Sequence, residues 1–292
     1  MYDSGVGGLS VLRHLWRLLP RETVLYVADS GRAPYGGRPP EEIVAFGVQI
    51  ATFLRGEGAQ VLVVACNTSS SVALPEVARA FGGPVVGMLE PAARAVAERW
   101  PRGGSVAVLA TATTVASGAY PRAIAGQAPA VDVVQEACPE WVPLVEAGRL
   151  DGPGVDEAVA RHVAPLLEPP GVDGLVLGCT HYPFLEPVIR RVMGRLGRSG
   201  ETPALLDPGL AVAEEAARVA AAFVTRRPED RGGRLPAHED EPCTKGSSGP
   251  CGVDRFFTSG SPERFAELFQ RLVGAAHEAC GREWGGVQVV RW

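Results

Sequence analysis

The sequence predicts an α/β protein with two similar lobes, each a mostly parallel sheet flanked by helices, and an active site in the cleft between them. Strand-like apolar runs alternate with helical patterns along the chain, which is typical of parallel sheets joined by right-handed crossovers. The stretch 174–183 repeats the design of 61–68, so that Cys179 aligns with Cys66. This repeat indicates two equivalent strand ends that present two thiols to one small substrate.

The composition argues against several classes of function. The chain has 292 residues, of which 46% are hydrophobic and 21% charged, and its net charge is −5. These values are ordinary for a soluble globular protein and provide no basic footprint for nucleic acid. No apolar run reaches the roughly 18 residues that a membrane span needs, and the N-terminus lacks a signal-peptide layout. We therefore expect a cytoplasmic protein with no nucleic-acid or membrane partner.

Residues 1–90 and 205–292 are expected to form lobe 1. Beyond a glycine-rich turn at the start of the chain, the spacing of apolar residues predicts alternating helices and strands. Pro75 must lie in the first turns of the helix after Cys66 or kink it. In residues 1–90 the predicted helices span 9–18 and 40–56, and the predicted strands span 24–28, 61–66 and 84–87.

Residues 91–204 are expected to form lobe 2, with the crossover between lobes near Glu90-Pro91. Hydroxyl side chains at 111–114 precede one of its helices. Pro183 opens another helix, a favoured place for proline because its missing N–H would have no partner there. The predicted strands of this lobe span 105–110, 131–134 and 174–178, and the other predicted helices span 92–99, 115–124 and 154–167.

The chain then returns to lobe 1 through a strand at 204–207 and a helix at 210–226. The polar residues 228–252 are expected to form a flexible insertion, because they have little apolar surface to bury. Residues 256–258 are predicted to form an edge strand, and 261–280 a closing helix.

The six cysteines are expected to be reduced, because disulfides are rare in chains that have a full core and no secretion signal. A single cysteine at a strand end is usually a buried, inert residue. Two at matched positions, each followed by polar residues that cap a helix, indicate reactive thiols, since a helix N-terminus stabilises a thiolate. His181 lies two residues after Cys179, and Asp3 lies on a turn that can face Cys66.

Other chemistries fit the sequence less well. Structural zinc sites need paired cysteine clusters, which are absent, and a Cys–His hydrolase would leave one of the two cysteines idle. Pyridoxal phosphate needs a lysine, and the only one, Lys245, lies in a Gly/Ser/Pro-rich run. The glycines at 5–8 lack the strand and the acidic residue of a dinucleotide fingerprint. We therefore expect no metal and no cofactor.

Two opposed thiols suit a reaction that is symmetric about one carbon, in which a proton leaves one face and another returns on the opposite face. The α-proton of an amino acid is very weakly acidic, so the site must stabilise a carbanion with hydrogen-bond donors. Such donors are offered by Ser4, the Tyr35-Gly36 loop, Asn67, Thr68 and Thr180.

Four blocks of the sequence resemble the signature blocks of the glutamate racemase family and occur in the same order. The blocks are Asp3-Ser4-Gly5-Val6-Gly7-Gly8-Leu9, Ala33-Pro34-Tyr35-Gly36, Ala65-Cys66-Asn67-Thr68 and Gly178-Cys179-Thr180-His181-Tyr182-Pro183. Residues 110–120, Cys138-Pro139 through Glu146 and 206–209 are similar too. The likeness covers nearly all of 3–226, with a weaker echo at 256–272.

The resemblance implies a cofactor-independent enzyme that interconverts L- and D-glutamate and supplies D-glutamate for bacterial peptidoglycan. It assigns the two proton transfers to Cys66 and Cys179, with assistance from Asp3 and His181. The substrate contacts that it implies are Asp3, Ser4, Pro34, Tyr35, Gly36, Asn67, Thr68, Thr111, Thr114, Thr180 and His181.

Two alternatives stay open at this point. Related racemases for aspartate and hydantoins share the two cysteines, so the substrate can be aspartate or another acidic compound, although Thr180-His181-Tyr182-Pro183 favours glutamate. Some family members interact with DNA gyrase, and a catalytically impaired chain that keeps only this role is the second alternative, which no basic patch supports. The resemblance also leads us to expect a homodimer.

Two features depart from the family pattern. Family members usually have a hydrophobic strand before the Asp-Ser turn, whereas only Met1-Tyr2 precede it here. If that strand is missing, Asp3 is expected to lie at a frayed terminus. The insertion at 228–252 lies far in sequence from every signature block, and we expect it to leave the chemistry intact.

Overall fold

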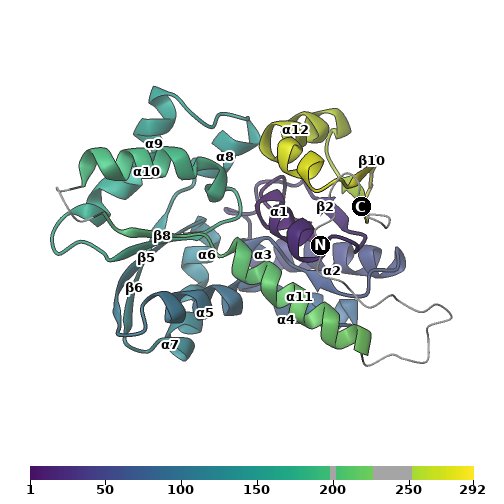
Figure 1. The fold of residues 1–292 in the computed structure, drawn as a ribbon, viewed down its shortest axis with the longest axis horizontal. Helices are drawn as coiled ribbons and strands as arrows, with labels where there is room; N and C mark the ends of the chain where they lie inside the picture. Colours follow the sequence, from purple (N-terminus) through teal and green to yellow (C-terminus); the bar gives the residue numbers. More distant parts are fainter. Residues whose placement is uncertain (198–201, 226–251) are drawn as a thin grey trace.

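The computed structural model describes residues 1–197, 202–225 and 252–292. Figure 1 shows two α/β lobes side by side, with helices packed around each sheet. The predicted fold class, two lobes of mostly parallel sheet flanked by helices, is confirmed. The predicted insertion at 228–252 lies, except for its last residue, outside the described residues.

The first lobe contains two parallel sheets that an isolated bridge connects. The larger sheet has the order β1-β2-β9-β10 and the smaller one pairs β3 with β4. A parallel bridge between Tyr2 and Val64 joins β1 to the residues that follow β3. The strands are β1 (Tyr2–Asp3), β2 (Leu25–Ala28), β3 (Leu62–Val63), β4 (Val85–Val86), β9 (Val253–Thr258) and β10 (Glu283–Val289).

The second lobe contains one four-stranded parallel sheet in the order β6-β5-β7-β8. Strand β7 is buried at all five of its residues, because it lies between β5 and β8 and has helices on its faces. A parallel strand covered in this way reads as a continuous apolar run. The strands are β5 (Gly104–Ala110), β6 (Val131–Ala137), β7 (Gly174–Gly178) and β8 (Ala204–Leu206).

The helices follow the strands in alternation, as the sequence predicts. The first lobe has α1 (Leu9–Leu18), α2 (Pro40–Gly56), α3 (Asn67–Val72), α4 (Leu74–Phe81), α11 (Gly209–Thr225) and α12 (Pro262–Ala279). The second lobe has α5 (Leu89–Arg99), α6 (Ala112–Ser117), α7 (Ala119–Gln127), α8 (Trp141–Glu146), α9 (Pro153–Leu167), the 3₁₀ turn η1 (Tyr182–Leu185) and α10 (Glu186–Leu196). Helix α3 of the first lobe lies against α5, α6 and α7 of the second.

The start of the chain is not frayed, and the expectation that Asp3 hangs from a loose terminus is wrong. Tyr2 pairs with Val27 of β2 on one side and bridges Val64 on the other. Both Tyr2 and Asp3 are fully buried. Two residues therefore suffice to form a central strand, because neighbours on both sides bond to its backbone.

Two helix predictions differ from the structure in the same way, because a local break divides the helix. The helix after Cys66 is two helices, and Pro75 lies in the first turn of the second one, α4. The helix predicted over 115–124 is also two, separated at Gly118, whose φ of 61° is left-handed and ends α6. The crossover expected near Glu90-Pro91 lies inside the first turn of α5.

The end of the chain differs more. Strand β9 is not an edge strand, because it lies between β2 and β10. Helix α12 does not close the fold, because β10 follows it and pairs in parallel with β9. Gly285 and Gly286 interrupt the apolar pattern of this strand, and the register shifts there. The predicted strand 61–66 is also shorter, since only Leu62–Val63 pair with β4.

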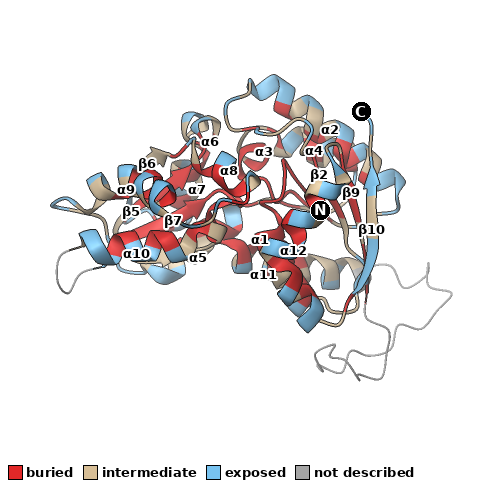
Figure 2. Ribbon diagram, turned by 90° about the horizontal axis from the view of Figure 1, so that it is seen from above, coloured by how far each residue is buried: buried red, intermediate tan, exposed pale blue. Residues whose placement is uncertain are grey.

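Burial is concentrated where the sheets and helices meet. Figure 2 shows buried residues along the strands and on the inner faces of the helices, with exposed residues outside. Helix α1 shows the pattern, because Leu9, Leu12 and Leu15 share one buried face. None of the described helices has both the length and the apolarity that a bilayer crossing requires.

Candidate active site

Cys66 takes the N-cap position of α3, just beyond β3. Its Sγ accepts a hydrogen bond from the backbone N–H of Ser69 at 3.4 Å. Burial, and after it the charge of the nearby Asp3 carboxylate, raise the pKa of Cys66 to about 12, although the Ser69 N–H and the Ser4 hydroxyl lower it. Cys66 is therefore held as a protonated thiol at neutral pH.

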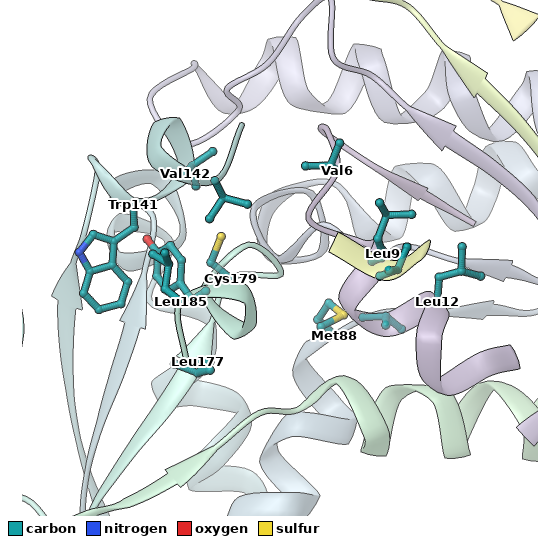
Figure 3. Close-up of a cluster of buried hydrophobic side chains, with 14 of the residues drawn as sticks. Val6, Leu9, Leu12, Met88, Trp141, Val142, Leu177, Cys179 and Leu185 are labelled. Carbon is teal, nitrogen blue, oxygen red and sulfur yellow. The ribbon is translucent and has the colours of Figure 1, made fainter. Parts of the chain in front are cut away.

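Cys179 follows β7 directly, at the equivalent place in the second lobe. Its Sγ lies 3.8 Å from Nδ1 of His181, and Nε2 of the same ring lies 2.7 Å from Oε1 of Glu146 at the end of α8. Both Cys179 and His181 are buried. Figure 3 shows Cys179 between the apolar side chains Trp141, Val142 and Leu185 of its own lobe and Val6 and Leu9 of the other.

His181 is positively charged in this arrangement. Burial lowers its pKa, but its hydrogen bonds to Cys179 and Glu146, together with the charges of both partners, raise the pKa well above its usual value. Burial raises the pKa of Glu146, and the hydrogen bond and the charge of His181 outweigh this and lower it. The pair is an imidazolium and a carboxylate, so one cation stands beside Cys179.

Asp3 bonds to the residue that follows Cys179. Its Oδ1 accepts a hydrogen bond from the Thr180 hydroxyl at 2.9 Å, and its Oδ2 accepts one from the Gly5 N–H at 2.9 Å. Burial raises the pKa of Asp3, and the charge of His181 offsets part of that rise. The turn that contains Gly5 and Gly7 packs directly against His181. Only glycine fits at position 7, because a Cβ there would lie 2.3 Å from Nδ1 of His181.

Hydroxyl and amide groups form a second contact between the lobes. Thr68 Oγ1 lies 2.9 Å from Thr111 Oγ1 and 3.3 Å from Thr114 Oγ1. The Oγ1 atoms of Thr111, the N-cap of α6, and Thr114, within α6, lie 3.0 Å apart. Oδ1 of Asn67 accepts a hydrogen bond from the Tyr120 hydroxyl at 2.6 Å. Nδ2 of Asn67 is buried and has no hydrogen-bond partner among the described residues. A donor free in this way is suited to an anionic ligand.

Comparison with known proteins identifies the relatives of this site. The family model for Asp/Glu/Hydantoin racemase matches residues 7–216. The chain belongs to this family. It is 43% identical to the glutamate racemase of Gloeobacter violaceus, over 91% of this chain and 89% of that protein.

Solved structures agree with the sequence comparison. The crystal structure of glutamate racemase from Thermus thermophilus in complex with β-chloro-D-alanine matches with a TM-score of 0.74 and 38% identity, covering 99% of this chain and 94% of that one. Glutamate racemase isoform RacE1 from Bacillus anthracis matches with a TM-score of 0.78 and 30% identity, covering 100% and 95%. The resemblance seen in the signature blocks is confirmed, and the chain is a racemase of the glutamate branch.

The racemase brings most of the predicted site residues together. Both cysteines, Asp3 and His181 meet where the lobes face each other, with Ser4 close to Cys66. The residues that lie around them, bonded to one another or across the lobes, are Asn67, Thr68, Thr111, Thr114 and Thr180.

The loop of the racemase that contains Pro34, Tyr35 and Gly36 belongs to the first lobe and extends to the second. Pro34 is exposed. The Tyr35 hydroxyl donates to Asp29 within its own lobe. Gly36 does reach the second lobe, because its carbonyl accepts a hydrogen bond from the Thr113 N–H at 3.1 Å.

Glu146 is the site residue that the sequence did not assign. It belongs to a block that resembles the family, but nothing local connects it with His181, which lies 35 positions later and meets it through the fold. Its Oε1 also accepts a hydrogen bond from the Val6 N–H at 3.0 Å, so it touches the glycine turn as well. Among the described residues, no group of three or more His, Cys, Asp or Glu side chains could hold a metal ion.

Proposed function

We propose that this racemase interconverts L- and D-glutamate without a cofactor, by a two-base proton transfer between Cys66 and Cys179. The observation that carries the proposal is the asymmetry of the two buried thiols. Cys179 has the His181 imidazolium beside it, whereas Cys66 has the Asp3 carboxylate nearby. Glutamate is the proposed substrate because proteins that are similar to this chain over most of its length are glutamate racemases.

The asymmetry prepares one acid and one base. Because the His181 imidazolium lies beside Cys179, we assign to Cys179 the role of the base that takes the α-proton. Cys66 keeps its proton and delivers it to the opposite face of the carbanion. After one turnover Cys179 carries the proton that left the substrate and Cys66 is the thiolate. The reverse reaction, or proton exchange with solvent, restores the starting state.

The carbanion is stabilised by donors aimed at the substrate carboxylate, onto which its charge spreads. Asn67 supplies the unpartnered Nδ2. The hydroxyls of Thr68, Thr111 and Thr114 now bond to one another, and rotation of their O–H groups lets them donate to an anion instead. Buried donors of this kind act more strongly than donors in water, because the surrounding medium screens them less.

The lobes must separate for the substrate to reach the thiols, because both sulfurs are buried. Hydrogen bonds between the lobes, such as Asp3 to Thr180 and Thr68 to Thr111, hold the site closed. We propose that lobe 1 (residues 1–90 and 205–292) moves against lobe 2 (91–204) in each catalytic cycle. Such closure excludes water from the reacting carbon.

The wider setting follows from the same proposal. The proposed enzyme works in the cytoplasm, and the D-glutamate that it makes supplies the synthesis of bacterial peptidoglycan. A homodimer and an interaction with gyrase stay predictions that rest on the family resemblance. The first is tested by the molar mass in solution, and the second by a supercoiling assay with purified gyrase.

The proposed activity is tested by incubating the purified chain with L-glutamate and no added cofactor. We expect D-glutamate to accumulate and circular dichroism to fall to zero as the mixture becomes racemic. A folded preparation that leaves L-glutamate unchanged contradicts the proposal. L-Aspartate assayed beside it decides the alternative substrate, and turnover of aspartate in preference to glutamate would replace the proposed substrate.

The charge on His181 predicts a pH effect for Glu146→Gln. In the wild type the raised pKa keeps the imidazolium through neutral pH, and the charge is lost only as the pH rises through that raised value. The amide removes the carboxylate charge, so the pKa of His181 falls. The alkaline limb of the kcat/KM profile is therefore expected to move to lower pH.

The matched control is Glu140→Gln, which changes a glutamate six positions earlier that pairs with Arg161 and His162 instead. This variant is expected to leave the alkaline limb where it is. An unmoved limb in Glu146→Gln, or an equal movement in both variants, contradicts the role given to the Glu146 carboxylate.

A further inference from the structure

Tyr120 connects the core of the second lobe with the substrate-binding side of the first. It lies near the start of α7, and its ring is fully buried among apolar residues of the second lobe that include Val96, Val108 and Ile124. Its hydroxyl crosses to the other lobe and donates to Oδ1 of Asn67 at 2.6 Å. The tyrosine is thus rigid at one end and bonded to a site residue at the other.

The position of this contact relates it to both thiols. Asn67 follows Cys66 directly, in the first turn of α3. Burial, and after it the charges of Cys179 and Asp207, raise the pKa of Tyr120 far above its usual value. The hydroxyl therefore keeps its proton and acts as a donor, and it lies within electrostatic reach of the second thiol.

A tyrosine that must donate decides which end of an amide it faces. Of the two ends of the Asn67 side chain, only Oδ1 accepts a hydrogen bond, while Nδ2 only donates. The contact therefore turns Nδ2 away from Tyr120, and this is the atom that is buried without a partner among the described residues. The reversed amide would leave the Tyr120 proton without an acceptor and would present Oδ1 in the place of Nδ2.

We propose that Tyr120 is a positioning residue, which fixes the Asn67 amide so that Nδ2 donates to the carboxylate of the substrate. The inference rests on the proposed function, because it takes an anionic amino acid as the ligand. Tyr120 itself touches no substrate. It selects a donor over an acceptor at one point of the site, and it does so only when the lobes are closed, since the two residues belong to different lobes.

The test is a double-mutant cycle of Tyr120→Phe and Asn67→Ala with steady-state kinetics on glutamate. Loss of one hydrogen bond to a charged ligand corresponds to a factor of about 10 to 100, which is the loss in kcat/KM expected for Asn67→Ala. Tyr120→Phe is expected to lose about tenfold by the same principle, mostly through a higher KM. In the Asn67→Ala background, Tyr120→Phe is expected to cause no further loss in kcat/KM, because Tyr120 acts only by orienting the Asn67 amide.

Tyr182→Phe is the matched control. Tyr182 is equally buried, and its hydroxyl donates to the backbone carbonyls of Ala110 and Cys138 rather than to Asn67. Its effect is expected to multiply with that of Asn67→Ala. If Tyr120→Phe also multiplies with Asn67→Ala, or leaves KM unchanged, Tyr120 does not act through the amide.

A second variant keeps the test decisive where Tyr120→Phe fails to fold. In Asn67→Asp one carboxylate oxygen still accepts from Tyr120, and the other places a negative charge where Nδ2 was. This variant is expected to be less active than Asn67→Ala, and greater activity overturns the proposal. If the wild-type protein does not racemise glutamate, both the proposed function and this inference are wrong. If the wild type is active but the effects of Tyr120→Phe and Asn67→Ala multiply, only the inference is wrong.

Discussion

Cys66→Ser and Cys179→Ser are each expected to lower kcat/KM for racemisation by about 10² to 10⁴, the range that a positioned acid or base contributes. A serine hydroxyl has nearly the shape of the thiol, but it is far less acidic, so it neither forms the anion that takes the α-proton nor gives up a proton readily. The measurement is the initial rate of D-glutamate formation from L-glutamate, repeated in the opposite direction.

Cys138→Ser is the control for this pair. Cys138 is also buried and also follows a strand, but its thiol donates to the backbone carbonyl of Glu136, and burial raises its pKa. It is expected to keep turnover close to that of the wild type. Near-wild-type turnover in either Cys66→Ser or Cys179→Ser contradicts a mechanism in which both thiols move protons.

Arg282→Ala is expected to destabilise the folded protein by about 3 to 5 kcal/mol, the cost of stranding one member of a buried ion pair. Arg282 bonds to both carboxylate oxygens of Asp254, at 2.7 and 2.8 Å, and both side chains are fully buried. The guanidinium also donates to the carbonyls of Pro20 and Glu22. Without it, these carbonyls lose a donor, and the buried carboxylate is left with Nε2 of His277, 3.5 Å away, beside it. Urea unfolding followed by far-UV circular dichroism gives the change in the free energy of unfolding.

Arg255→Ala provides the comparison, because Arg255 is next to Asp254 in β9 but pairs with Glu57 at the surface. A surface pair contributes about 0 to 1 kcal/mol, so this variant is expected to lose little. Replacing both buried partners, Arg282→Met with Asp254→Leu, is expected to recover much of the stability, since no charge is left alone. Equal losses in Arg282→Ala and Arg255→Ala contradict this account of the buried pair.

The parts of the fold that the sequence predicted are those that depend on local patterns. Helices α1 and α2 and strands β5 and β7 have long apolar runs or regular spacing, and their bounds agree with the expected ones within one residue. The repeat around Cys66 and Cys179 also lies within short stretches. Each combines a buried strand with polar residues that begin a helix, and the topology then brings the two strand ends together.

The features that the sequence missed depend on contacts between distant segments. Strand β1 is stable with two residues because β2 and Val64 flank it. Strand β10 contains two glycines and forms only because β9 offers its edge. Glu146 has no local signal that pairs it with His181, which lies 35 positions later. Tertiary pairing decides each of these positions.

The most direct test of the two-thiol mechanism is the fate of the α-proton when L-glutamate is racemised in D₂O and sampled early. The D-glutamate formed and the L-glutamate that remains are separated and analysed by mass spectrometry. With one thiol on each face, the product is expected to contain solvent deuterium while the remaining substrate keeps its protium. Protium carried over into D-glutamate, or deuterium in the unreacted L-glutamate at the rate of racemisation, would mean that a single group handles both faces and would contradict the mechanism.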